Sequence, residues 1–273
     1  MSVSVAWIDG HWGHPDILNM PLSDRGLQLA DGLFETILIL EGQPILLEEH
    51  LRRWASSAMQ LGMAAPPIQQ DLEPLIDEAI TRSSMHLSSG ALRLNWSRGS
   101  SQHRGIGLSP SNKHRFWLTL QPHNPLFHSI TTITSRLERR NCNSLVNRCK
   151  TFAYINSIQA RREAHQAGAD DALLLNTQTE LCCGTAANLF VRRHGIWLTP
   201  PLNSGCLPGV MRARGLSEGI VKEANLGTTL EPDDEPLLIN SLNCHPIRMH
   251  DKKPTKDFRD AKELWDKLTR RSS

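Results

Sequence analysis

The sequence predicts an α+β fold divided into two domains. Three observations support this prediction: strand-like runs occur in pairs around turn residues, helical periodicity is confined to segments between blocks of strands, and a proline-containing stretch divides the chain near its middle. A regular alternation of single strands and helices would instead indicate a doubly wound parallel sheet. With 273 residues, the chain is long enough to bury a sizeable core.

The first half of the chain combines hairpins with two helices. Asp9-Gly10 and Glu41-Gly42-Gln43 are turn sequences beside apolar runs, which is typical of hairpins. After the second hairpin, apolar residues recur at helical spacing until Gly62 and Pro66-Pro67 stop the pattern. The expected strands span residues 3–8, 35–40, 44–47, 91–96, 116–120 and 129–136, and the expected helices span 48–63 and 72–82.

The stretch Gln121-Pro122-His123-Asn124-Pro125 is the best candidate for an interdomain linker, since two prolines close together disfavour both helix and strand. We therefore divide the chain into a small N-terminal domain (1–121), a linker (122–127) and a larger C-terminal domain (128–273). The expected C-terminal strands span 172–176, 180–183, 188–192 and 196–199, and the expected helices span 153–167, 208–222 and 261–268.

Charge and composition exclude several classes of function. Thirty basic and 28 acidic residues give a net charge of +2, so no global field attracts nucleic acid or an anionic membrane. No apolar run approaches the roughly 20 residues that span a bilayer, and we expect a cytoplasmic protein. The six cysteines lack paired spacing and are expected to be reduced thiols. The 12 histidines lack ligand spacing, so no metal site is expected.

Several short motifs occur in a fixed order along the chain. They are Asp24-Arg25-Gly26, residues 31–36, 50–53, 92–105, Lys150, 181–190 and 205–212. Each is weak alone, but together they resemble class IV aminotransferases, the fold-type IV pyridoxal-phosphate enzymes, and are most similar to aminodeoxychorismate lyase. The resemblance implies a D-amino-acid aminotransferase-like fold, with a small N-terminal α/β layer and a larger, barrel-like C-terminal β domain with flanking helices. It also implies a homodimer with its active site between the domains.

The same resemblance implies the catalytic residue. Lys150 would bind pyridoxal 5'-phosphate covalently and then move protons once the substrate has displaced it, which needs a nucleophilic, basic amine. Without the resemblance, a surface lysine would be the better interpretation. Tyr154 lies four residues later, where one helical turn would bring both side chains to one face, near the phenolic oxygen of the cofactor.

The resemblance also implies four phosphate ligands. Arg53 matches the arginine of the family, although a solvated helix face is its ordinary alternative. Val210 and Met211 would contribute backbone amides at a helix start that follows Pro208. Met211 stands where the family often has a threonine, so one side-chain donor is missing. Ser241 is a looser match, for which an ordinary strand-end serine is the alternative.

Cys183 is the main departure from the family pattern. It falls where the family usually has a glutamate facing the pyridine nitrogen, and a thiol keeps that nitrogen protonated less well than a carboxylate. Glu180 does not replace it, because residues three apart on a strand point to opposite faces unless a bulge intervenes. A buried strand cysteine without a role is the alternative interpretation.

Cys183 favours elimination over amino-group transfer, because formation of an aromatic product needs less electron withdrawal by the cofactor ring. The leading hypothesis is therefore a lyase that converts 4-amino-4-deoxychorismate to 4-aminobenzoate and pyruvate in folate biosynthesis. Arg98 and Arg104 could bind a carboxylate of this small-molecule amine. Asn188, from the lyase-like string around Cys183, is also expected to contact the substrate. The alternatives are a branched-chain or D-amino-acid aminotransferase and a non-catalytic relative.

Overall fold

The computed structural model describes residues 3–101, 105–108 and 113–270. The chain forms two compact units. The first contains the residues up to Asn124 together with Lys150–Ala153, and the second contains Pro125–Cys149 and Tyr154 onwards. The first crossing lies inside the expected linker. The return of Lys150–Ala153 to the first unit has no counterpart in the expected domain boundaries.

The first unit is built on an antiparallel sheet with the strand order β2-β1-β6-β5-β3-β4. The two expected hairpins are present, with turns at Asp9-Gly10 and Glu41-Gly42, and both residues of each turn have positive φ. The long central pairing runs from Gly32↔Ser97 to Leu40↔Ser89. The strands are β1 (Val5–Ile8), β2 (His11–Gly13), β3 (Gly32–Leu40), β4 (Gln43–Pro44), β5 (Ser89–Ser97) and β6 (Arg115–Pro122).

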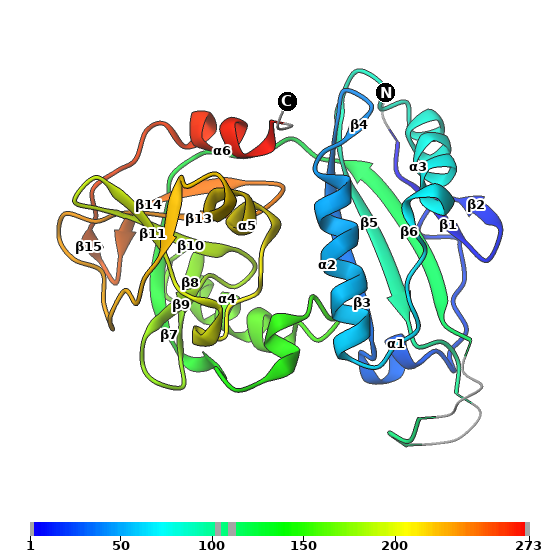
Figure 1. Ribbon diagram of the computed structural model, residues 1–273, viewed down its shortest axis with the longest axis horizontal. Helices are drawn as coiled ribbons and strands as arrows, with labels where there is room; N and C mark the ends of the chain where they lie inside the picture. The colour runs from blue at the N-terminus through cyan, green and yellow to red at the C-terminus, as the bar shows by residue number, and fades with distance from the viewer. Residues whose placement is uncertain (1–2, 102–104, 109–112, 271–273) are drawn as a thin grey trace. The chain divides into compact units, whose positions relative to one another are not determined.

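Helices α2 (Leu47–Gln60) and α3 (Gln69–Ser83) pack on this sheet, α2 against β3 and α3 against β6 and β1 (Figure 1). Their apolar stripes carry Trp54, Leu72 and Ile76 into the core, where each is almost fully buried. The short helix α1 (Arg25–Leu29) is capped by the Asp24 carboxylate, which accepts from the Gly26 amide.

The second unit contains a closed barrel. Strand order β10-β13-β14-β7-β8-β9 returns to β10 through the pair Cys183↔Asn188, so six strands complete a ring, and β11 and β12 extend the sheet beyond β10. Leucines from several strands fill the core of this unit. The strands are β7 (Ile130–Arg140), β8 (Asp171–Asn176), β9 (Leu181–Cys183), β10 (Asn188–Arg193), β11 (Ile196–Thr199), β12 (Val221–Glu223), β13 (Glu235–Ile239), β14 (Cys244–His250) and β15 (Lys253–Pro254).

Three α-helices flank the barrel: α4 (Ile155–Gln166), α5 (Val210–Ser217) and α6 (Ala261–Thr269) (Figure 1). The expected helix 208–222 is too long. Gly219, with φ +69°, follows the end of α5, and the chain then enters β12. Two 3₁₀ turns complete the unit at Leu145–Arg148 and Leu202–Ser204. Within the described part of the chain, no helix is both long and apolar enough to cross a bilayer.

Candidate cofactor site

Lys150 lies in an extended segment of the first unit. The Phe34 amide donates to the Lys150 carbonyl at 2.9 Å, the Phe152 amide donates to Gly32 at 3.0 Å, and Leu33 bridges Thr151. Gly32 is required here, because a Cβ at this position would lie 2.2 Å from the Phe152 ring. The segment therefore adds to the edge of β3 and fixes the backbone of the lysine.

The start of α4 contradicts the expected helical relation between Lys150 and Tyr154. The helix begins at Ile155, and Tyr154 is its N-cap residue, so no helical turn joins the two side chains. The Lys150 Nζ atom instead lies 4.4 Å from the centre of the Phe34 ring, within cation–π range. Arg93 lies over the same ring at 3.6 Å. Phe34 therefore positions the amine.

Arg53 belongs to a buried charged cluster between α2 and β3. Its Nε donates to Glu35 Oε1 at 2.8 Å, and its second terminal nitrogen contacts Oε2 of the same carboxylate. His50 Nδ1 lies 2.7 Å from Glu35 Oε2. Because one edge of the Arg53 guanidinium is held by Glu35, its orientation is fixed before any ligand binds.

The cluster changes the titration of its members. Burial alone would raise the pKa of Glu35, but the Arg53 guanidinium and the His50 ring lower that pKa to about 2. Burial lowers the pKa of His50, and the charges of Arg53 and Lys150 lower it further. Glu35 is therefore a carboxylate at neutral pH, and its charge balances that of Arg53.

Helix α5 begins in the second unit without a side-chain cap. Its N-cap is Gly209, and Val210 and Met211 form its buried first turn. A Cβ at Gly209 would lie 1.9 Å from Asn188 Oδ1, while Asn188 Nδ2 donates to the Leu207 carbonyl at 2.9 Å. Asn188 therefore shapes the turn that enters α5, and the amides of the first turn remain without a capping side chain.

Cys183 lies at the end of β9 in a cluster that also contains Cys182 and Cys206. All three are free, buried thiols. The neighbouring Cys182 thiol and the Arg140 guanidinium lower the pKa of Cys183 to about 6, although burial and Asp171 act in the opposite direction. The Cys182 thiol donates to the Ser204 carbonyl at 3.3 Å. The two neighbouring cysteines and burial raise the pKa of Cys182.

Arg140 is the cation of this cluster. It ends β7, and its terminal nitrogen donates to Ser157 Oγ at 2.9 Å and to the Thr185 carbonyl at 3.5 Å. Tyr154 is close enough to contribute to the raised pKa of Arg140, of which Cys183 is the main cause. Tyr154, Ser157 and Thr185 also line a cavity of about 580 Å³ along α4.

Ser241, a predicted phosphate ligand, and Glu180, which was not expected to replace Cys183, both lie in loops. Ser241 lies in the turn between β13 and β14, where the Asn240 side chain accepts from the amides of Leu242 and Asn243. Asn240 also donates to the Ala186 carbonyl at 3.3 Å. Glu180 bonds to the Asn176 side chain and also contacts Asn225, so it supports the β8–β9 turn.

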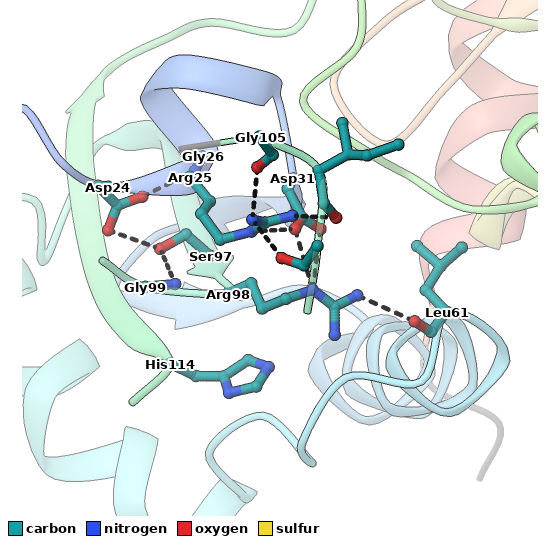
Figure 2. Close-up of polar contacts among 12 residues, drawn as sticks. Asp24, Arg25, Gly26, Asp31, Leu61, Ser97, Arg98, Gly99, Gly105 and His114 are labelled. Carbon is teal, nitrogen blue, oxygen red and sulfur yellow. Dashed lines mark hydrogen bonds and ion pairs between the residues drawn. The ribbon is translucent and has the colours of Figure 1, made fainter. Parts of the chain in front are cut away.

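Arg98 has a structural role in the first unit, and Figure 2 shows it beside Arg25. Both guanidinium groups donate to Asp31, at 3.0 Å and 2.8 Å respectively. Arg98 also donates to the carbonyls of Gly62 and Leu61 at 2.9 Å and 3.0 Å. The Arg98 guanidinium is therefore engaged within the first unit, and its expected contact with a substrate carboxylate stays a prediction. Arg104 lies outside the described residues.

Sequence reasoning missed Glu35, Arg140 and Arg25. Glu35 belongs to the motif 31–36. Because it lies on a strand of apolar residues that is expected to be buried, its carboxylate needs a charged partner, and this was the available signal. Arg25 is buried and donates to the carbonyls of Gly105, Ile106 and Gly107 in the loop after Arg104. Arg140 had no local signal, since its partners lie far along the chain.

Comparison with known proteins decides the family. The profile of amino-transferase class IV matches residues 32–249, which is most of the chain. The chain belongs to the class IV aminotransferase family. This class IV chain is 29% identical to the "Putative branched-chain-amino-acid aminotransferase" of Methanocaldococcus jannaschii, over 80% of this chain and 74% of that protein.

Other relatives of this class IV chain have lyase names. It is 30% identical to the "Putative aminodeoxychorismate lyase" of Schizosaccharomyces pombe, over 77% of this chain and 85% of that protein. Among solved structures, the "Putative 4-amino-4-deoxychorismate lyase" of Legionella pneumophila superposes with a TM-score of 0.83 at 26% identity, covering 93% of this chain and 96% of that one. The expected D-amino-acid aminotransferase-like fold is confirmed.

The family and its cofactor-bound structures indicate pyridoxal phosphate as the cofactor. The donor groups of this chain fit it. Lys150 offers an amine held over an aromatic ring, Arg53 offers an oriented guanidinium, and α5 offers the amides of an uncapped first turn.

Proposed function

We propose that this class IV enzyme is a lyase that converts 4-amino-4-deoxychorismate to 4-aminobenzoate and pyruvate. The observation that carries the proposal is the environment of Cys183, the position matched to the family glutamate. The side chains that lower the pKa of its thiol are those of Cys182 and Arg140, and neither is a carboxylate. Bound pyridoxal phosphate would supply an electron sink for the substrate amine.

A thiol at this position favours elimination for an electronic reason. Amino-group transfer passes through a carbanion that only the cofactor ring stabilises, so it needs a firmly protonated ring nitrogen. In the proposed elimination, the leaving oxygen and the forming aromatic ring both draw electron density away. The lyase names of two relatives are consistent with this preference.

The residues of the chain have distinct proposed roles. Lys150 would hold the cofactor through its amine and, once the substrate amine has taken its place, would take the proton from the ring carbon that bears the amine. The neighbouring carbon–oxygen bond would then break, and the departing enolpyruvate would take up a proton on its methylene carbon to become pyruvate. Arg53, Val210, Met211 and Ser241 bind the phosphate, with Arg53 held in place by Glu35.

Two residues complete the proposed site. Tyr154 contacts the phenolic oxygen of the cofactor. Arg104 binds a substrate carboxylate, and Arg25 anchors the loop that follows Arg104 by holding the carbonyl of Gly105. Asn188 acts indirectly, by shaping the turn that enters α5. The proposed assembly is a homodimer in the cytoplasm, serving folate biosynthesis.

The test is an assay of purified protein with pyridoxal phosphate and 4-amino-4-deoxychorismate, in which pyruvate and 4-aminobenzoate are quantified together. We expect a visible absorption band of lysine-bound cofactor and equal amounts of the two products. A band without these products, but with amino transfer from a branched-chain or D-amino acid to an α-keto acid, would replace the lyase by an aminotransferase. No band and no turnover would indicate a non-catalytic relative.

A further inference from the structure

Arg140 is a partly buried cation without a carboxylate partner among the ion pairs of the described residues. The carboxylate that acts on the neighbouring Cys183, that of Asp171, is already bound: Arg161 contacts it at 2.6 Å and Thr185 Oγ donates to it at 2.7 Å. A partly buried cation is stabilised by an anion placed beside it. Arg140 therefore favours a negative charge on any acidic group that the fold brings close to it.

The geometry of three strands brings one acid to Arg140. Arg140 pairs with Asn176 at the end of β7, and Cys183 pairs with Leu174 on the other side of β8. The Arg140 side chain bonds to Ser157 and to Thr185, two residues beyond Cys183. Asn176 and Leu174 are two residues apart on β8, so the side chains of their partners Arg140 and Cys183 lie on the same face of the sheet. A guanidinium in this position stabilises a thiolate, as positive neighbours do at reactive cysteines.

We propose that Cys183 is a thiolate paired with Arg140, and that this pair faces the ring nitrogen of the bound cofactor, where the sulfur and the nitrogen share one proton. The contact with the ring nitrogen rests on the proposed function. A proton on the nitrogen is donated to the thiolate, and a proton on the sulfur is donated to the nitrogen. The hydrogen bond persists in both states, but the ring is a weaker electron sink than beside a carboxylate.

The titratable groups around the sulfur act in both directions. Arg140 and Cys182 favour the anion, while burial and Asp171 oppose it. Cys206, on the far side of Cys182, has a pKa lowered by the Cys182 thiol and by Arg212. Tyr154 contributes to the raised pKa of Arg140. Arg140 is thus a positioning residue that sets the charge of Cys183. It was not among the site residues expected from the sequence.

The first experiment follows ultraviolet thiolate absorbance of the full chain during a pH titration without cofactor. We expect a step near pH 6, well below the value of about 8.5 for an ordinary thiol. The step is lost in Cys183→Ser and moves upward by at least about one pH unit in Arg140→Gln, whereas Arg140→Lys retains it. The matched control is Cys244→Ser, since burial raises the pKa of Cys244 to about 12 and its removal should leave the step unchanged.

A step that survives in Cys183→Ser, or the absence of any step below the ordinary thiol value, would overturn the pair. The second experiment titrates the absorption band of the cofactor-loaded protein. Its pH dependence should change in Cys183→Ser and not in Cys244→Ser. An unchanged dependence would overturn the contact with the ring nitrogen while leaving the proposed lyase intact. Loss of the band in the unaltered protein would overturn the proposed function, and the titration without cofactor would still decide the pair.

Discussion

Each unit contains a partly buried arginine, and the acidic group beside that arginine differs between the units. In the first unit, Arg53 is held by the Glu35 carboxylate, which His50 also contacts. In the second unit, Arg140 is held by a hydroxyl, a carbonyl and the Cys183 sulfur. The carboxylate is charged at every pH near neutrality, because its pKa is lowered to about 2. The thiol has its pKa lowered to about 6, so its charge depends on conditions.

This difference suggests a division of roles. A permanent ion pair keeps a guanidinium in one orientation, which suits an arginine that must receive a phosphate. A thiolate that can be protonated instead adjusts the electron demand of the group it faces. The negative charge beside Arg53 in the first unit is therefore constant, whereas the negative charge beside Arg140 in the second unit depends on pH.

The largest effect is expected from removing the Lys150 amine in the first unit. Lys150→Ala should abolish both the absorption band of lysine-bound cofactor and all turnover, because no other amine is held over Phe34 among the described cation–π pairs. Spectroscopy and the product assay check this. Lys222→Ala, an exposed lysine on β12, is the matched control and should behave as the unaltered protein. Turnover by the first variant would remove Lys150 from its role.

The next effect is on stability. Glu35→Gln breaks a buried pair and leaves the Arg53 charge without its partner, which should lower the free energy of unfolding by about 3–5 kcal/mol. Glu78→Gln interrupts an exposed pair with Arg82 on α3 and should cost less than about 0.5 kcal/mol. Denaturant unfolding of both variants measures the difference. Equal losses in the two variants would contradict the contrast between buried and exposed pairs.

Acid should remove the same contribution without mutation. Because the folded pKa of Glu35, about 2, lies below its unfolded value of 4.5, its contribution is fully present above the unfolded value and is lost as the pH falls through about 2. The shift corresponds to roughly 3 kcal/mol. The stability gap between the unaltered protein and Glu35→Gln should therefore narrow between pH 4.5 and pH 2. A gap that stays constant across this range would assign the loss to packing.

The smallest of these effects is expected from a substitution that makes the surroundings of Arg140 resemble those of Arg53. Cys183→Glu gives Arg140 a carboxylate partner and should raise the ratio of amino transfer to elimination by about tenfold, which is about 1.4 kcal/mol. Parallel assays of the two half-reactions measure this ratio, with Cys244→Ser as the control. An unchanged ratio would mean that Cys183 does not face the reacting system.

Much of the fold could be predicted from local signals. The turns at Asp9-Gly10 and Glu41-Gly42, the helical periodicity of α2 and the hairpin of β8 and β9 depend on residues close together in the chain. The end of α5 was missed because apolar residues continue beyond Gly219, where the chain becomes strand β12. Its parallel pairing with β11 overrides the local preference for helix.

The candidate site was harder to predict. The motifs located Lys150 and Cys183, but the partners of Cys183 depend on the alignment of three strands. A register shift in β7 between Thr134 and Arg139 decides where the Arg140 side chain lies. Likewise, Tyr154 was placed on the wrong kind of backbone, because the pairing of residues 150–153 with β3 holds them extended. Such long-range pairing leaves no local signature.

The segment Lys150–Ala153 also constrains the order of folding. Its bonds to Gly32 and Phe34 tie a late part of the chain to an early strand, so the first unit is discontinuous in sequence. During synthesis, the emerging N-terminal sheet has to wait for the whole of β7 to be made before its last backbone partners arrive. Lys150, the proposed attachment point of the cofactor, is thus among the last residues to join the first unit, and an incompletely synthesised chain lacks the amine that would capture the cofactor aldehyde.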